Sequence, residues 1–133
     1  MNKARLKKIA AWILFIFTGA MFFMVGVGKF TQASWPQRFA EWGYPANFYM
    51  VIGAVEVLAG IGMLIPRIRT YAAASLLVVM LGALGTHIIH AETPNIIVTS
   101  VWSVILGCIT YAHRSAFSKA RRDVLMQSGT AGP

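Results

Sequence analysis

The sequence is poor in charged residues. Only 12% of its 133 residues are charged, against about 25% in soluble globular domains, while 57% are hydrophobic. A soluble domain of this length buries only about two-thirds of its surface, so it could not hide this much apolar side chain from water. The composition therefore indicates a chain that is solvated by lipid.

Cysteine is nearly absent, and acidic residues are few. The single Cys108 excludes an intrachain disulfide, a CxxC redox pair and a cysteine-rich metal site. The net charge of +8 does not indicate a nucleic-acid partner, because the Lys and Arg residues flank apolar runs instead of gathering on one solvated face. We therefore expect the bilayer, and no nucleic acid, as the main partner.

Four long apolar runs predict four transmembrane helices, at residues 9–27, 47–65, 71–89 and 94–112. Lipid offers the backbone no hydrogen-bond partner, so each run must be helical, and none shows the alternation of a barrel strand. The first run continues past the usual length of a signal peptide and has no A-x-A-like site, so we interpret it as an uncleaved anchor. The predicted fold is an all-α integral membrane four-helix bundle, a single domain over 1–133.

Two segments lie beside the predicted spans. Residues 34–42 lie in an aromatic-rich loop after the first span and predict a short interfacial helix, which would serve as an anchor or as a lid. Residues 115–133 are basic and then rich in Ser and Gly, which predicts a flexible tail.

Lys and Arg are distributed unevenly among the segments between the spans. Ten of the 12 lie in the N-terminal tail, in the turn between the second and third spans, and in the C-terminal tail. The remaining two are Lys29 and Arg38. Because cytoplasmic segments carry the excess of Lys and Arg, we expect a multi-pass protein of the cytoplasmic (inner) membrane with both termini cytoplasmic.

Glu56 is a carboxyl in the middle of the second predicted span. It lies about ten residues into the run, roughly 15 Å deep at 1.5 Å per residue. An ionised carboxylate there costs at least about 2.5 kcal/mol, so the group is either protonated or paired inside the bundle. Gly53 and Gly60 flank it at helical spacing and let this face approach another helix. Glu56 either handles protons or a ligand, or forms an interhelical hydrogen bond that only fixes the packing.

His87 and His90 are three residues apart near the outer end of the third predicted span, and Glu92 follows in the turn. They are candidates for proton exchange, for a metal site or for headgroup contacts. His87 lies roughly 9 Å from Glu56 along the bundle axis, so we expect no direct contact between them. Two histidines on one helix cannot clamp a haem from opposite faces, so haem is not expected.

The polar residues gather at one predicted mouth of the bundle. Lys29 would snorkel to lipid phosphates, form an ion pair with Glu92 or Glu41, or contact an anionic or quinone-like headgroup above Glu56. The candidate site therefore consists of two catalytic candidates and a set of ligand-binding candidates. These are Glu56 and His87 as catalytic residues, with Lys29, Trp35, Arg38 and His90 as ligand contacts.

Four sequence blocks occur in order along the chain: GVGKF at 26–30, FAEWGYP at 39–45, GAVEVLAGIGMLIP at 53–66 and MLGALGTHIIHAE at 80–92. Together they resemble the DoxX-like family of small four-helix membrane proteins. The resemblance implies that Lys29, Glu56, His87 and His90 occupy recurring polar positions. It also implies a relation to membrane subunits of a thiosulfate:quinone oxidoreductase, although this chain lacks a cysteine pair for sulfur chemistry.

The sequence leaves three functions open. No complete catalytic set is visible, which favours a small accessory or assembly subunit that binds another membrane protein or a second copy of itself. The alternative is a quinone-associated redox subunit in which Glu56 or His87 exchanges the protons of a quinone. Small-solute transport is the least favoured, because four short helices leave little room for an alternating-access core.

Overall fold

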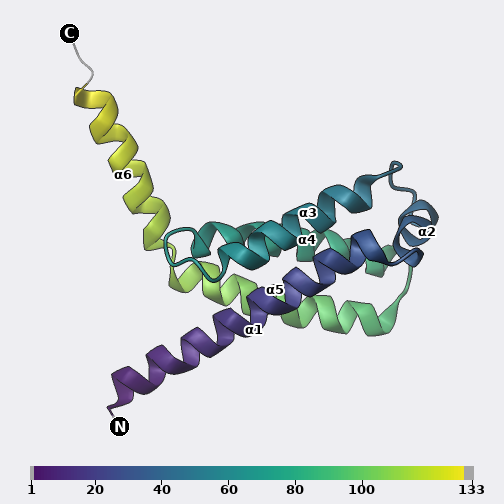
Figure 1. Cartoon of the computed structure of the whole chain (residues 1–133), viewed down its shortest axis with the longest axis horizontal. Coiled ribbons are helices and arrows are strands. Elements are labelled where there is room, and N and C mark those ends of the chain that lie inside the picture. The colour runs from purple at the N-terminus through teal and green to yellow at the C-terminus, as the bar shows by residue number, and fades with distance from the viewer. Residues whose placement is uncertain (1, 131–133) are drawn as a thin grey trace.

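The computed structural model describes residues 2–130, and within this range the chain forms helices and no strand (Figure 1). The helices are α1 (Lys3–Thr31), α2 (Ser34–Glu41), α3 (Phe48–Gly62), α4 (Arg69–Ile89), α5 (Thr93–Ala112) and α6 (Ser115–Thr130). The predicted all-α fold is confirmed.

The long helices α1, α3, α4 and α5 run back and forth along one axis. Helix α1 packs along α3, α4 packs along α5, and α3 contacts α4. Figure 1 shows α2 and the α4–α5 turn at one end of the bundle, and the N-terminus and α6 at the other. We call these the α2 end and the basic end, because Lys and Arg residues cluster at the second.

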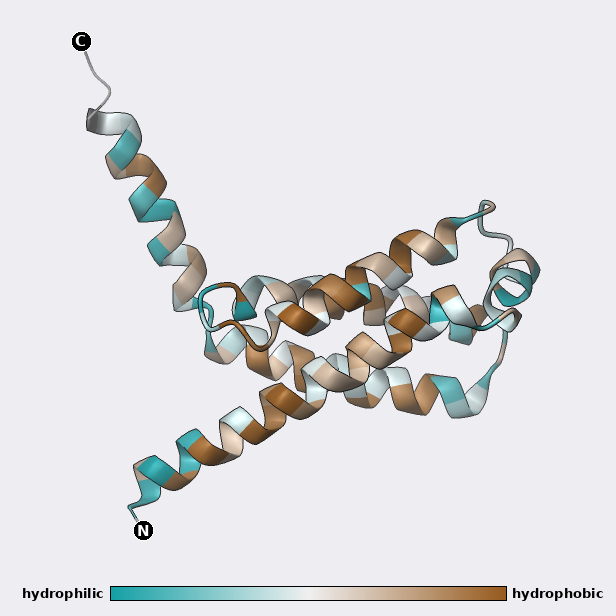
Figure 2. Cartoon of the chain, viewed as in Figure 1, coloured by the Kyte–Doolittle hydropathy of each residue, from teal (hydrophilic) through white to brown (hydrophobic). Residues whose placement is uncertain are grey.

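The bundle is built for a bilayer. Helices α1, α4 and α5 are long and apolar enough to cross a membrane, whereas α3 has only 15 residues, about 22 Å of helix. Figure 2 shows that the helices of the bundle are hydrophobic over much of their length. Large apolar side chains remain exposed on them, including Ile13 at 63%, Leu58 at 69% and Val104 at 65%. Such surfaces need lipid in place of water.

Glycines set the close contact between α1 and α3. A Cβ on Gly60 would lie 2.7 Å from the carbonyl oxygen of Gly19, and a Cβ on Gly26 would lie 2.8 Å from the carbonyl oxygen of Gly53. Only glycine allows the two backbones to approach this closely. The prediction that Gly53 and Gly60 bring the Glu56 face against another helix is confirmed.

Helices α1 and α5, in contrast, meet through aromatic rings. Trp102 on α5 packs edge-on against Phe22 at 5.3 Å and stacks with Phe17 at 6.2 Å between ring centroids. These large side chains hold the two helices apart, so the bundle keeps space between α1 and α5.

The segments that flank the bundle are more helical than predicted. Helix α1 begins at Lys3, so the basic stretch before residue 9 is part of the helix. Within the tail predicted over 115–133, residues Ser115–Thr130 form helix α6, and residues 131–133 lie outside the described range. Its Ala, Lys, Arg, Leu, Met and Gln residues are good helix formers, and the first glycine comes only at Gly129.

Candidate functional site

A cavity of about 440 Å³ lies among α1, α3, α4 and α5 at the α2 end. Its walls are largely aliphatic and aromatic, with a small number of polar side chains. This volume and this lining are typical of small-molecule sites, which bury most of a ligand's surface and fix it with a few polar groups.

The deepest polar feature of the cavity is an ion pair between Lys29 on α1 and Glu56 on α3. Lys29 Nζ lies 2.6 Å from Glu56 Oε2, and the two residues are only 5% and 1% exposed. Helix α1 extends to Thr31, so Lys29 lies within the helix and faces α3 beside Gly53, one turn from Glu56. Its long side chain spans that turn, which makes Glu56 its partner.

The predicted pairing of Lys29 with Glu92 or Glu41 is therefore wrong. The prediction placed Lys29 beyond the end of the first span, where its amine would reach outward to the loops or the lipid phosphates. In the structure the ammonium points inward instead, and Glu92 has other partners.

Helix α2 lies over the cavity as a small aromatic cover. Phe39 is 6% exposed and packs against neighbouring rings, among them Trp35, Trp42 and Tyr44. The ring centroid of Trp35 is 4.4 Å from Lys29 Nζ, so α2 also shields the ion pair through a cation–π contact.

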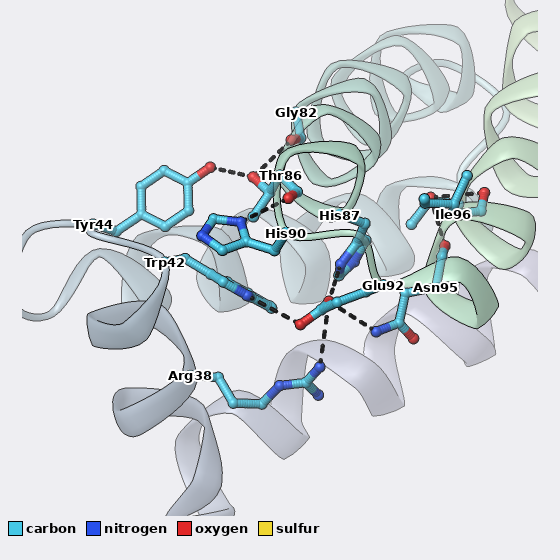
Figure 3. A network of polar contacts seen from close by, with 11 residues as sticks. Arg38, Trp42, Tyr44, Gly82, Thr86, His87, His90, Glu92, Asn95 and Ile96 are labelled. Atoms are coloured by element: carbon cyan, nitrogen blue, oxygen red, sulfur yellow. Dashed lines mark hydrogen bonds and ion pairs between the residues drawn. The ribbon is translucent and has the colours of Figure 1, made fainter.

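A second polar cluster surrounds Glu92 in the α4–α5 turn (Figure 3). Its carboxylate accepts hydrogen bonds from Asn95 Nδ2 at 3.1 Å and Trp42 Nε1 at 3.3 Å, and its Oε2 lies 2.5 Å from His87 Nδ1. Arg38 Nη2 lies 3.8 Å away. The cluster joins α2, α4 and α5 at the rim of the cavity.

These contacts favour the ionised form of Glu92. The hydrogen bond from the Asn95 amide, helped by those from His87 and Trp42, outweighs partial burial and lowers the pKa of Glu92 from its ordinary 4.5.

Tyr44 connects the loop after α2 to α4, because its hydroxyl is hydrogen-bonded to the hydroxyl of Thr86.

The two candidate histidines have different surroundings. His87 is 9% exposed and lines the cavity, whereas His90 is exposed and its Nδ1 is hydrogen-bonded to the carbonyl oxygen of Thr86. No group of three His, Cys, Asp or Glu side chains that could hold a metal ion occurs within residues 2–130.

The structure thus divides the predicted site residues into two sets. Lys29, Trp35, Glu56 and His87 line one cavity, which places Glu56 and His87 around a common space although they make no direct hydrogen bond. Arg38 and His90 lie outside it, beside Trp42. Glu92 was expected either to join His87 and His90 in a metal or proton site or to pair with Lys29, and Asn95 was not predicted. The turn sequence AETPN, with a carboxyl and an amide three residues apart, could have drawn attention to both.

The sequence matches the profile of the DoxX-like family over residues 13–109. Neither a search of curated proteins nor a search of solved structures finds a match. The matched range includes the whole cavity lining.

Proposed function

This chain belongs to the DoxX-like family, and on that basis and from the geometry of its cavity we propose that it binds a neutral, quinone-like molecule in the membrane. The observation that supports the proposal is the Lys29–Glu56 ion pair inside an apolar, aromatic cavity. In this role the chain is a quinone-associated subunit of a membrane redox system.

The charge balance of the cavity favours a neutral ligand. Lys29 and Glu56 neutralise one another at 2.6 Å, and Glu92 at the rim is balanced by Arg38. A charged molecule would have to break one of these pairs in a medium where an uncompensated charge is very costly. A neutral molecule leaves both pairs intact.

The donors and the walls of the cavity favour a flat ring with carbonyl oxygens. An ammonium has three N–H donors. One N–H of the Lys29 ammonium donates to Glu56, and a second side of the ammonium faces the Trp35 ring. One N–H donor therefore remains for a ligand oxygen. Around it, Phe39, Trp42 and other rings offer the aromatic faces on which a planar ring stacks.

The cavity also has a route to the bilayer. Two of its lining residues, Val78 on α4 and Val98 on α5, are 70% and 51% exposed on the apolar surface of the bundle. A hydrophobic tail attached to the ring could therefore leave the cavity laterally and remain in lipid.

Tryptophan fluorescence tests the proposal directly, because Trp35, Trp42 and Trp102 line the cavity and quinones quench nearby indoles. We expect a short-chain benzoquinone to quench the detergent-solubilised protein saturably. The double variant Lys29→Met/Glu56→Gln removes the donor without leaving an unpaired charge, and should bind about tenfold more weakly. Glu41→Gln, an exposed carboxyl of α2, is the matched control and should bind normally. Linear, non-saturating quenching would reject the proposal.

A second candidate is an accessory or assembly subunit that binds another membrane protein. Helix α6 leads away from the bundle (Figure 1), and its Val124 and Leu125 are 63% and 59% exposed. If α6 is the docking element, a stoichiometric partner should copurify in mild detergent and should be lost on deletion of residues 115–133. A partner that stays bound without α6 would exclude this surface.

We also propose that the basic end faces the cytoplasm. The start of α1 and helix α6 lie there, and ten of the 12 Lys and Arg residues belong to the segments at this end. An excess of these residues marks the cytoplasmic side of inner-membrane proteins. The cavity would then open near the outer surface of the membrane.

A further inference from the structure

The imidazole of His87 has two nitrogens in different surroundings. Nδ1 lies 2.5 Å from Glu92 Oε2, whereas Nε2 has no hydrogen-bond partner among residues 2–130. The residue lines the cavity. The ring therefore has one nitrogen held at the rim and one available to a bound molecule.

Glu92 decides which nitrogen carries the proton. An ionised carboxylate can only accept hydrogen bonds, and the donors from Asn95 and Trp42 hold Glu92 in that state. His87 Nδ1 must then carry the hydrogen that Glu92 accepts. Nε2 is consequently a pure acceptor when the ring is neutral, and becomes a donor only when the ring takes up a second proton.

The ring is also fixed in position. Trp42 packs edge-on against it, with centroids 5.4 Å apart and an interplanar angle of 84°, while the Trp42 indole N–H donates to the same Glu92 carboxylate. Trp42, which caps the C-terminus of α2, therefore contacts both His87 and Glu92. This arrangement of carboxylate, oriented imidazole and free Nε2 is the one that general acid–base sites use.

We propose that His87 exchanges protons with the molecule bound in the cavity, and that Glu92 is the positioning residue that keeps its Nε2 available for that exchange. The inference rests on the proposed function, since it needs a ligand oxygen near Nε2. When an electron donor of the redox system supplies two electrons to a bound quinone, His87 gives one of the two protons that the quinone takes up. When an electron acceptor removes two electrons from the quinol, His87 takes one of the two protons released. The ring then exchanges its proton with water at the rim, where the Glu92 side chain is 28% exposed.

The other charged and titratable groups near His87 have separate roles. Arg38 on α2 neutralises Glu92 from 3.8 Å, and Lys29 on α1 and Glu56 on α3 are paired with each other. His90, which caps the C-terminus of α4, is exposed and is not among the residues that line the cavity. Tyr44 is hydrogen-bonded to Thr86. Among the described residues, His87 is thus the cavity-lining imidazole with a free nitrogen.

A distinctive pH dependence follows. A quinone only accepts hydrogen bonds, so it gains one from His87 only when the ring is protonated, whereas a quinol hydroxyl can donate to the neutral ring. The affinity for a short-chain benzoquinone should therefore be about tenfold higher when the ring is protonated, and so higher at acidic than at alkaline pH. The affinity for the corresponding benzoquinol should change in the opposite direction.

Variants of Glu92 and His87 distinguish a positioning role of Glu92 from a purely structural one. In Glu92→Gln the neutral amide can accept from Nδ1 or donate to it, so both tautomers occur and the tenfold change should shrink to less than about threefold. His87→Gln should abolish the dependence for both redox forms, and the control His90→Gln should keep it. If Glu92→Gln weakens binding equally at every pH, Glu92 has only a structural role and the inference is overturned.

The two proposals fail in different ways. If the wild-type protein binds neither the benzoquinone nor the benzoquinol, the proposed function is wrong and the inference falls with it. If it binds both with affinities that do not depend on pH, the function stands and the role of His87 and Glu92 is refuted. Thermal unfolding of each variant at both pH values verifies that the compared proteins are folded.

Discussion

Replacing Glu56 by glutamine removes one half of the buried ion pair and leaves the other half in place. The Lys29 ammonium is 5% exposed and would keep only the Trp35 ring, 4.4 Å away, as a favourable electrostatic contact. Removing one partner of a buried pair typically costs about 3–5 kcal/mol, because the remaining charge is uncompensated. We expect Glu56→Gln to lower the free energy of unfolding by about that amount.

The matched variants give the prediction its specificity. Lys29→Met should cost less, because the remaining carboxyl can be neutralised by taking up a proton. The double variant Lys29→Met/Glu56→Gln leaves no buried charge and should be close to the wild type, within about 1 kcal/mol, or more stable. The coupling energy from this double-mutant cycle should therefore be large.

Unfolding of the detergent-solubilised protein, followed by circular dichroism during denaturant titration, provides the free energies. The prediction fails if the two single losses simply add in the double variant, since the residues would then act independently. It also fails if Glu56→Gln is as stable as the wild type. That result would mean that the Lys29 ammonium needs no counterion and therefore does not lie in an apolar interior.

Three further predictions concern packing, pH and topology. Gly60→Ala should destabilise the bundle by about 1–3 kcal/mol, since its Cβ would lie 2.7 Å from a carbonyl oxygen of α1, whereas Gly107→Ala meets nothing within 4 Å and should be neutral in the same unfolding assay. The pKa of Glu92 is lowered on folding, so its contribution to stability is complete above about pH 4.5 and is lost as the pH falls through the folded value. Asn95→Ala removes the largest cause of that shift, so the loss of melting temperature should be largest at pH 7 and should shrink as the pH falls below about 4.5. A loss that does not change with pH would refute the assignment. The variant Ala46→Cys, made in a chain without Cys108, should react with an impermeant maleimide on intact cells if the basic end is cytoplasmic. Labelling that occurs only after lysis would show that the opposite orientation is correct.

Composition and hydropathy predicted much of the fold. A bilayer demands long apolar helices with internally paired backbones, so four runs and a biased distribution of Lys and Arg were enough to predict the bundle. The spacing of Gly53, Glu56 and Gly60 also predicted correctly that this face packs closely against another helix. Such features depend on the period of a single helix and on its solvent, and both can be read from sequence.

The pairing of charges could not be predicted in the same way. Lys29 lies near the end of an apolar run, and two more residues of helix decide whether its amine turns inward to Glu56 or outward to lipid. The roles of Glu92 and Asn95 depend on how α2 folds over the α4–α5 turn and brings Trp42 to the carboxylate. Trp42 and Glu92 are 50 positions apart, and no local pattern determines their contact, whereas the hydrogen bond from Asn95 to Glu92 lies within the AETPN turn.

A density map of the protein prepared with a short-chain benzoquinone tests the central claim most directly. We expect a flat ring in the cavity, with one carbonyl oxygen within hydrogen-bond distance of Lys29 Nζ, and the Lys29–Glu56 pair intact beside it. A cavity that holds only lipid acyl chain at saturating quinone, or one in which side chains have closed the space between Lys29 and His87, would contradict it.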